Sequence, residues 1–93
     1  MRSAKKYSVP VNVIQMCTSM AYSSSAAECV EKAGKFKTRP KALRACLGIN
    51  HSNYALSCVE NAGRGDLSGE IVKACVNSSS YSSSQSECIK DLL

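Results

Sequence analysis

The chain has 93 residues and a net charge of +5, with no Trp, one Phe and an apolar content carried mainly by Ala, Val, Leu and Cys. This length suits one domain with a small core, which is marginally stable unless another constraint is present. Six cysteines in so short a chain indicate a disulfide framework in an oxidising compartment, and no stretch approaches the roughly 18–20 apolar residues of a membrane span.

The N-terminal segment, residues 1–8, is a basic arm that carries Arg2, Lys5 and Lys6. It begins as a secretory signal peptide does, but it lacks the apolar run of about 7–15 residues and the small-residue cleavage site. We therefore expect a secreted or periplasmic protein whose signal peptide is not part of this sequence. A single domain is expected over residues 1–93.

A repeat of 29 residues organises the rest of the chain. Its first cysteine recurs at positions 17, 46 and 75, and its second at positions 29, 58 and 88. The last repeat is one residue longer within the serine-rich segment NSSSYSSSQSEC, residues 77–88, where a turn tolerates an insertion. A fixed period of this length is typical of repeat architectures.

Each repeat predicts two short helices joined by a turn, because apolar residues recur at i, i+1 and i+4 on both sides of a polar segment. The predicted fold class is therefore all-α, with six short helices in three tandem hairpins. The hairpins are expected at residues 9–34, 38–63 and 67–93 and to stack as a small α-solenoid-like single domain.

Capping signals support these helices and predict where they end. Ser25 with Glu28 and Ser84 with Glu87 fit capping boxes at helix N-termini. Pro10 and Pro40 fit the first turns of helices. Gly34 and Gly63 fit helix C-terminal caps. The remaining N-caps are expected among Asn50, Ser52 and Asn53, and among Asp66 and Ser68.

The turns place Tyr22, His51 and Tyr81 at one repeat-equivalent position, seven residues before each second cysteine. In a stacked array these three side chains would lie on the same edge. This edge is a candidate contact surface, and the alternative is that the rings only pack over their own turns.

The cysteines are predicted to pair within each hairpin, because the two members of each pair are equidistant from the middle of their turn. Cysteines related by the repeat would lie roughly 10 Å apart or more, from helix spacings of 8–10 Å, whereas a disulfide needs Cα atoms within about 7 Å. The predicted pairs are Cys17–Cys29, Cys46–Cys58 and Cys75–Cys88.

Two other uses of the cysteines are less favoured. A thiolate metal site prefers a local C-x₂₋₄-C chelate, and the sequence contains none. Catalytic thiol chemistry needs a base beside an accessible cysteine, and the single histidine, His51, occupies a turn position held by tyrosine in the other repeats. No metal, cofactor or catalytic residue is therefore expected.

The single staple in each hairpin resembles, in design only, two known groups: the mitochondrial coiled-coil-helix–coiled-coil-helix proteins and the secreted cysteine-rich Sel1-like repeat proteins. The former use paired C-x₉-C motifs, and the latter have longer repeats with a shorter cysteine spacing. The spacings here are C-x₁₁-C, C-x₁₁-C and C-x₁₂-C, so the chain is placed in neither family.

A basic block without any acidic residue lies between residues 32 and 44, and its cations are Lys32, Lys35, Lys37, Arg39, Lys41 and Arg44. It is either a binding patch for an anionic partner or a solvated connector that keeps the protein soluble. Nucleic acid is a less favoured partner because Phe36 is the only aromatic residue in the block. An amphipathic membrane helix is disfavoured by Gly34 and Pro40, which interrupt the segment.

These patterns favour a non-enzymatic binding or interaction module over an enzyme. The expected partner is a protein or an anionic surface that contacts a helix face or the basic block. The alternative from another class is a small thiol-active or metal-handling protein, which would keep its cysteines reduced.

Overall fold

The computed structural model describes residues 9–20 and 22–93. The predicted basic arm, residues 1–8, lies outside the described residues, as does Ala21. The described part contains no strand and six α-helices: α2 (Val11–Cys17), α3 (Ser23–Lys35), α4 (Pro40–Cys46), α5 (Ser52–Arg64), α6 (Gly69–Asn77) and α7 (Ser82–Lys90).

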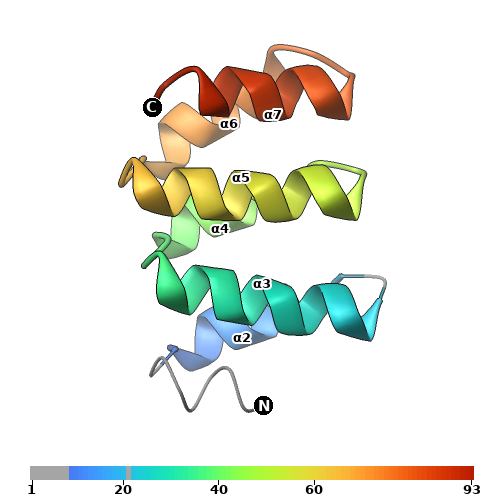
Figure 1. Ribbon diagram of the computed structural model, residues 1–93, viewed down its shortest axis with the longest axis vertical. Helices are drawn as coiled ribbons and strands as arrows, with labels where there is room; N and C mark the ends of the chain where they lie inside the picture. Colours follow the sequence, from blue (N-terminus) through green and yellow to red (C-terminus); the bar gives the residue numbers. More distant parts are fainter. Residues whose placement is uncertain (1–8, 21) are drawn as a thin grey trace.

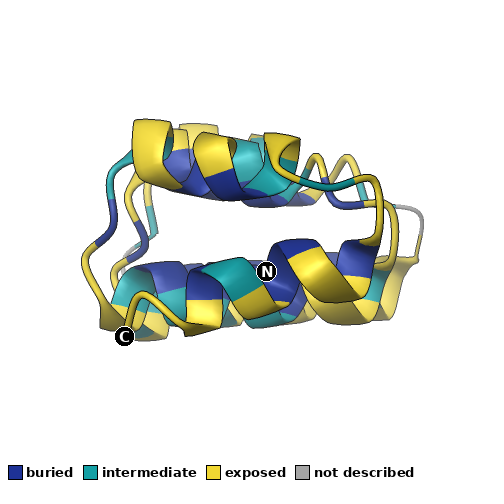
Figure 2. Cartoon of the chain, turned by 90° about the horizontal axis from the view of Figure 1, so that it is seen from above, coloured by how far each residue is buried: buried dark blue, intermediate teal, exposed yellow. Residues whose placement is uncertain are grey.

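Consecutive helices form three antiparallel hairpins, α2–α3, α4–α5 and α6–α7, which stack along the long axis of the molecule (Figure 1). The first helices of the hairpins make one layer and the second helices make the other (Figure 2). The three hairpin turns lie at one end of the helices, and the two connectors between hairpins lie at the opposite end (Figure 1). The predicted all-α fold of three stapled hairpins is confirmed.

The core lies between the two layers and is built from small side chains at repeat-equivalent positions. The residue after each second cysteine is fully buried, at Val30, Val59 and Ile89. Leu43 and Val72, in α4 and α6 of the other layer, are also fully buried. Because no large aromatic side chain separates the layers, the helices pack closely and the core stays thin.

Each hairpin is closed by its own disulfide, and no disulfide joins two hairpins. The Cα–Cα distances are 5.6, 5.5 and 5.5 Å for Cys17–Cys29, Cys46–Cys58 and Cys75–Cys88. All six cysteines are therefore oxidised, and they belong to the core or pack against it.

Helices α3 and α7 begin three residues earlier than their capping signals predicted, whereas α5 begins within its predicted range. The N-cap residues are Tyr22, His51 and Tyr81, and none of them makes a side-chain capping hydrogen bond. The predicted capping boxes are wrong, because Ser25 and Ser84 lie inside the first helical turn. In contrast, Ser68 caps α6 by accepting a hydrogen bond from the Ile71 amide, as the sequence predicted.

The glycines expected to cap α3 and α5 lie inside those helices instead. The left-handed residues are Lys37 (φ 54°) and Asp66 (φ 49°). Schellman-type bonds close both ends, because Thr38 N donates to Ala33 O at 3.0 Å and Leu67 N donates to Ala62 O at 2.9 Å.

Close packing explains the glycine in α5. A Cβ added at Gly63 would lie 2.6 Å from Phe36 Cβ and 2.7 Å from Thr38 Oγ1. The first connector therefore rests directly on the α5 backbone at this position. A larger residue there would push the first hairpin away from the second.

Candidate functional site

The predicted basic block does not form one continuous patch, because two of its cations pair with acids nearly one repeat further along the chain. Lys32 Nζ donates to Glu60 Oε1 at 2.7 Å and so joins α3 to α5. Arg39, in the first connector, donates through Nε and an Nη to both carboxylate oxygens of Asp66 in the second connector, each at 2.9 Å. These two cations therefore link adjoining repeats.

The electrostatics of these pairs follow from their hydrogen bonds. The pKa of Glu60 is lowered, mainly by the hydrogen bond from Lys32. Burial raises this pKa, and the charges of Lys32, Arg64 and Lys35 lower it further. The hydrogen bond and charge of Arg39 lower the pKa of Asp66, and Asp66 in turn raises the pKa of Arg39. Glu60 and Asp66 are therefore held in the ionised form.

The aromatic ring in the block is approached by cations from both hairpins that flank the first connector. Lys35 Nζ lies 5.5 Å from the centroid of Phe36, and Arg64 Cζ lies 5.2 Å from it. These distances fit cation–π contacts. Phe36 therefore does not offer a free platform on which a nucleic-acid base could stack.

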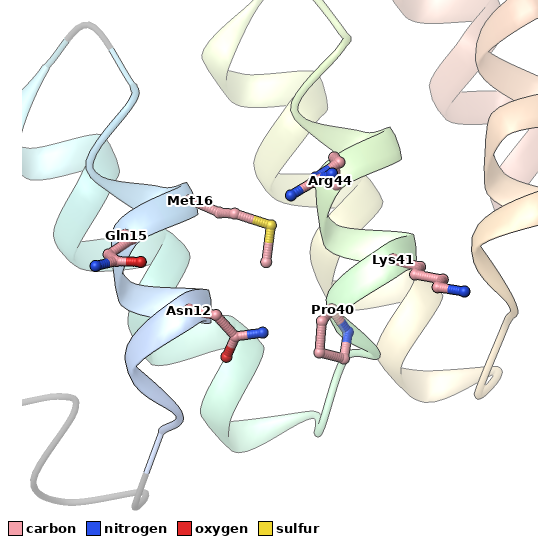
Figure 3. Close-up of a pocket in the computed structure, with 6 residues that line it drawn as sticks. All are labelled: Asn12, Gln15, Met16, Pro40, Lys41 and Arg44. Atoms are coloured by element: carbon pink, nitrogen blue, oxygen red, sulfur yellow. The ribbon is translucent and has the colours of Figure 1, made fainter.

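The last two cations of the block, Lys41 and Arg44, lie on the exposed face of α4. They border a groove of about 550 Å³ between α2 and α4. In Figure 3, Met16 and Arg44 point toward this groove from opposite helices, whereas Lys41 points away from it, toward α6. The remaining lining residues are Asn12, Gln15 and Pro40, so no acidic residue among the described ones borders the groove.

A second groove, of about 410 Å³, lies between α4 and α6. It is the repeat equivalent of the first, with Lys41 and Arg44 now on one wall and Lys73 on the other. Glu70 also borders it, and its small and apolar lining residues are Ala45, Gly48, Gly69 and Val76. Two equivalent grooves therefore open on the same face of the first layer.

We name the exposed side of α2, α4 and α6 the basic face, and its three cations are Lys41, Arg44 and Lys73. Within residues 9–20 and 22–93, none of these cations makes an ion pair. Sequence reasoning missed Lys73 because it lies outside the block, although it stands one repeat after Arg44. The repeat period was the signal that could have found it.

The structure also brings Tyr22, His51 and Tyr81 to one edge, since all three precede second helices at the turn end of the stack. Tyr22 and Tyr81 are 66% and 73% exposed. His51 contacts Tyr54 edge to face, with ring centroids 6.2 Å apart. The two tyrosine rings therefore project from their turns and do not pack over them.

The oxidised cysteines of this structure offer no free thiolate for metal binding or catalysis. All six sulfurs are in disulfides. In the part of the chain that the structure describes, no group of three or more His, Cys, Asp and Glu side chains could hold a metal ion. Likewise, no described helix is both long and apolar enough to cross a bilayer.

Comparison of the chain with protein-family models, with curated proteins and with solved structures finds no match. Function is therefore inferred from the chemistry of the surfaces themselves.

Proposed function

We propose that this protein is a non-enzymatic interaction module, secreted or periplasmic, that binds an acidic partner protein through the basic face. The proposal rests on one observation: Lys41 and Arg44 border both of two equivalent grooves, Lys73 borders the second, and none of the three forms an ion pair with a described acid. The basic block expected from the sequence contributes two of these three cations.

The distribution of ion pairs supports this choice of surface. Lys32 and Arg39 already have acidic partners, so a ligand would have to displace an existing hydrogen bond to reach them. Arg44 carries a guanidinium that can bind a carboxylate through two parallel hydrogen bonds. The unpaired cations are therefore the ones that gain most from an acidic partner.

The grooves support a protein partner over a small anion. Ala45 and Gly48 have little or no side chain, so they let a partner segment approach the backbone closely at the C-terminal end of α4. Met16 adds a flexible apolar wall in the first groove, and methionine adapts well to varied partner side chains. A segment that alternates acidic and aliphatic residues would satisfy both the cations and the apolar lining.

The proposed compartment is supported by the disulfides. Three staples in a chain with a thin core are typical of proteins that fold and act in oxidising surroundings. In a reducing cytosol the same chain would lose the bonds that fasten each hairpin.

A direct binding experiment tests the basic face. A fluorescent peptide of alternating Glu and Leu is titrated with the oxidised protein, and binding is followed by fluorescence anisotropy. The triple variant Lys41→Ser, Arg44→Ser and Lys73→Ser should bind at least about tenfold more weakly, because hydrogen bonds to charged groups contribute roughly 1.5–3 kcal/mol each.

The matched control removes the same number of positive charges elsewhere, by Lys35→Ser, Lys37→Ser and Lys90→Ser. It should bind the peptide as the wild type does, because these cations lie outside both grooves. Equal losses in the two triple variants would show only a net-charge effect and would contradict the proposal.

The thiol-active or metal-handling alternative makes a different prediction for the native protein. It needs free thiolates, whereas all six sulfurs are in disulfides here. Thiol counting on unfolded but unreduced protein should find none. Six reactive thiols in protein taken from its native compartment would overturn the proposed function.

A further inference from the structure

Among the described residues, the end of the molecule that holds the three hairpin turns carries no formal charge from Asp, Glu, Lys or Arg. We name it the turn edge, and it comprises the described residues 18–20, 22–27, 47–56 and 76–86. A typical surface is about a quarter to a third charged. Serine, asparagine and aromatic residues replace the charges here.

The aromatic residues of this edge are not explained by helix formation. Tyr22, His51 and Tyr81 hold N-cap positions, with φ of -111°, -89° and -92° and ψ of 137°, 125° and 125°. Ser, Thr, Asp and Asn are preferred there because their side chains accept amide hydrogen bonds. All three helices forgo that bond, and a departure from a local rule without structural gain is expected at functional positions.

The turn edge also contains a recess of about 190 Å³ between the turns of the first and second hairpins. Met20, Leu47 and Ile49 supply apolar walls, and Ser19, Asn50 and Ser52 supply polar groups. Ser19 Oγ donates to Met16 O at 2.7 Å, so its lone pairs remain able to accept a hydrogen bond. The recess is smaller than the roughly 300–1,000 Å³ typical of drug-sized ligands and suits one sugar ring.

We propose that the turn edge binds a neutral glycan, with one sugar in the recess and others against the exposed rings. Sugars combine hydroxyl groups with apolar C–H faces, which match the hydroxyls, amides and aromatic rings of this edge. An uncharged surface complements an uncharged ligand, whereas an anionic ligand is better served by the basic face. This site is separate from the proposed acidic-partner surface.

The stack also suits a chain of sugars more than a single one. Packed helices lie about 8–10 Å apart, so the three equivalent rings form a row along which an extended oligosaccharide can lie. Tyrosine and serine are also the residues that antibody binding loops favour, because rigid rings give contact area and small polar groups adapt their hydrogen bonds.

Solution NMR tests the proposal on the oxidised full chain. Amide shifts are recorded while cellohexaose, fully N-acetylated chitohexaose or maltohexaose is added, each a soluble neutral hexasaccharide. At least one should shift amides of the turn edge, and Tyr22→Ala or Tyr81→Ala should each weaken binding by roughly two- to tenfold. Tyr22→Phe and Tyr81→Phe should retain binding, because the ring is kept.

One substitution should strengthen binding. His51→Tyr gives the second hairpin the ring of its two siblings and should tighten binding by roughly two- to tenfold. The control variant Lys41→Ser with Arg44→Ser should bind the glycan as the wild type does. Thermal melting of each variant checks that the fold is retained.

Three results would overturn the proposal. The first is that none of the three hexasaccharides shifts turn-edge amides. The second is that binding occurs but survives Tyr22→Ala combined with Tyr81→Ala. The third is that these tyrosine variants lose an acidic protein partner instead, which would make the edge part of a protein interface.

Discussion

The two interfaces between hairpins are built from the same repeat but from different chemistry. In the first, Lys32 pairs with Glu60, and the buried Thr38 hydroxyl donates to Val59 O at 2.7 Å. In the second, Leu67 takes the place of Thr38 and is buried. Within the described residues, no ion pair joins a helix of the second hairpin to a helix of the third. Both interfaces share the apolar core, and in the described residues the first adds polar contacts where the second has Leu67.

The first layer, formed by α2, α4 and α6, also packs differently at the two interfaces. α2 packs less extensively against α4 than α6 does, and the groove beside α2 is the larger of the two, at about 550 Å³ against about 410 Å³. The first hairpin is therefore held mainly through α3 and the first connector.

Reduction is expected to break both interfaces and to have the largest effect. Closing a loop of this size contributes about 2.5–3 kcal/mol in the chain-entropy model, so three staples contribute on the order of 8 kcal/mol, which equals the net stability of many domains. The reduced protein should be unfolded at room temperature. Thermal denaturation with and without reductant measures this, and an unchanged midpoint in fully reduced protein would contradict it.

Gly63→Ala should break the first interface selectively. Its Cβ would meet Phe36 Cβ at 2.6 Å, and overpacking of this kind costs about 1–3 kcal/mol. Hydrogen exchange should rise mainly in the first hairpin. Gly48→Ala is the control, because its Cβ would come no closer than 3.2 Å to Ala45 O.

The corresponding change in the second interface is Gly69→Ala, whose Cβ would lie 2.6 Å from Lys41 Cβ. In the Gly69→Ala variant, hydrogen exchange should rise mainly in the third hairpin. The same exchange pattern for both alanine variants would show that the two interfaces unfold as one unit and do not differ in the way their contacts suggest.

Thr38→Val should weaken the first interface by about 1 kcal/mol, the usual net value of an intramolecular hydrogen bond. The new side chain has a similar shape, so packing against α5 is kept. Chemical denaturation measures the change. Thr18→Val serves as the control, since that hydroxyl is exposed and bonds to Gln15 O within its own hairpin, and an equal loss there would count against the interface role.

Acidification should weaken the first interface by the smallest amount. The pKa of Glu60 is lower in the folded protein than in the unfolded chain, where a glutamate titrates near about 4.3. The stabilisation is therefore complete above that pH and is lost as the pH falls through the lower, folded value. Melting temperatures of wild type and Glu60→Gln should converge at acidic pH, and a constant gap would contradict this.

Much of the fold could be predicted because the cysteines repeat with a fixed period and are symmetric about each turn. The N-caps of α3 and α7 could not, since Tyr22 and Tyr81 do not resemble capping residues and the serines that do lie inside the helices. The contact between Lys32 and Glu60 spans nearly one period. A search for opposite charges about one repeat apart would have predicted this link between hairpins. A search for local motifs does not compare residues so far apart.

Every disulfide lies within one hairpin, with partners only 12 or 13 residues apart. During export to the proposed oxidising compartment, each staple can therefore form as soon as its own hairpin has crossed the membrane, before the next pair of cysteines emerges. Vectorial oxidation of this kind disfavours mispairing. Because each disulfide lies within one repeat, adding or deleting a whole repeat would leave the other disulfide pairs unchanged. The number of repeats can therefore change without any new pairing of cysteines.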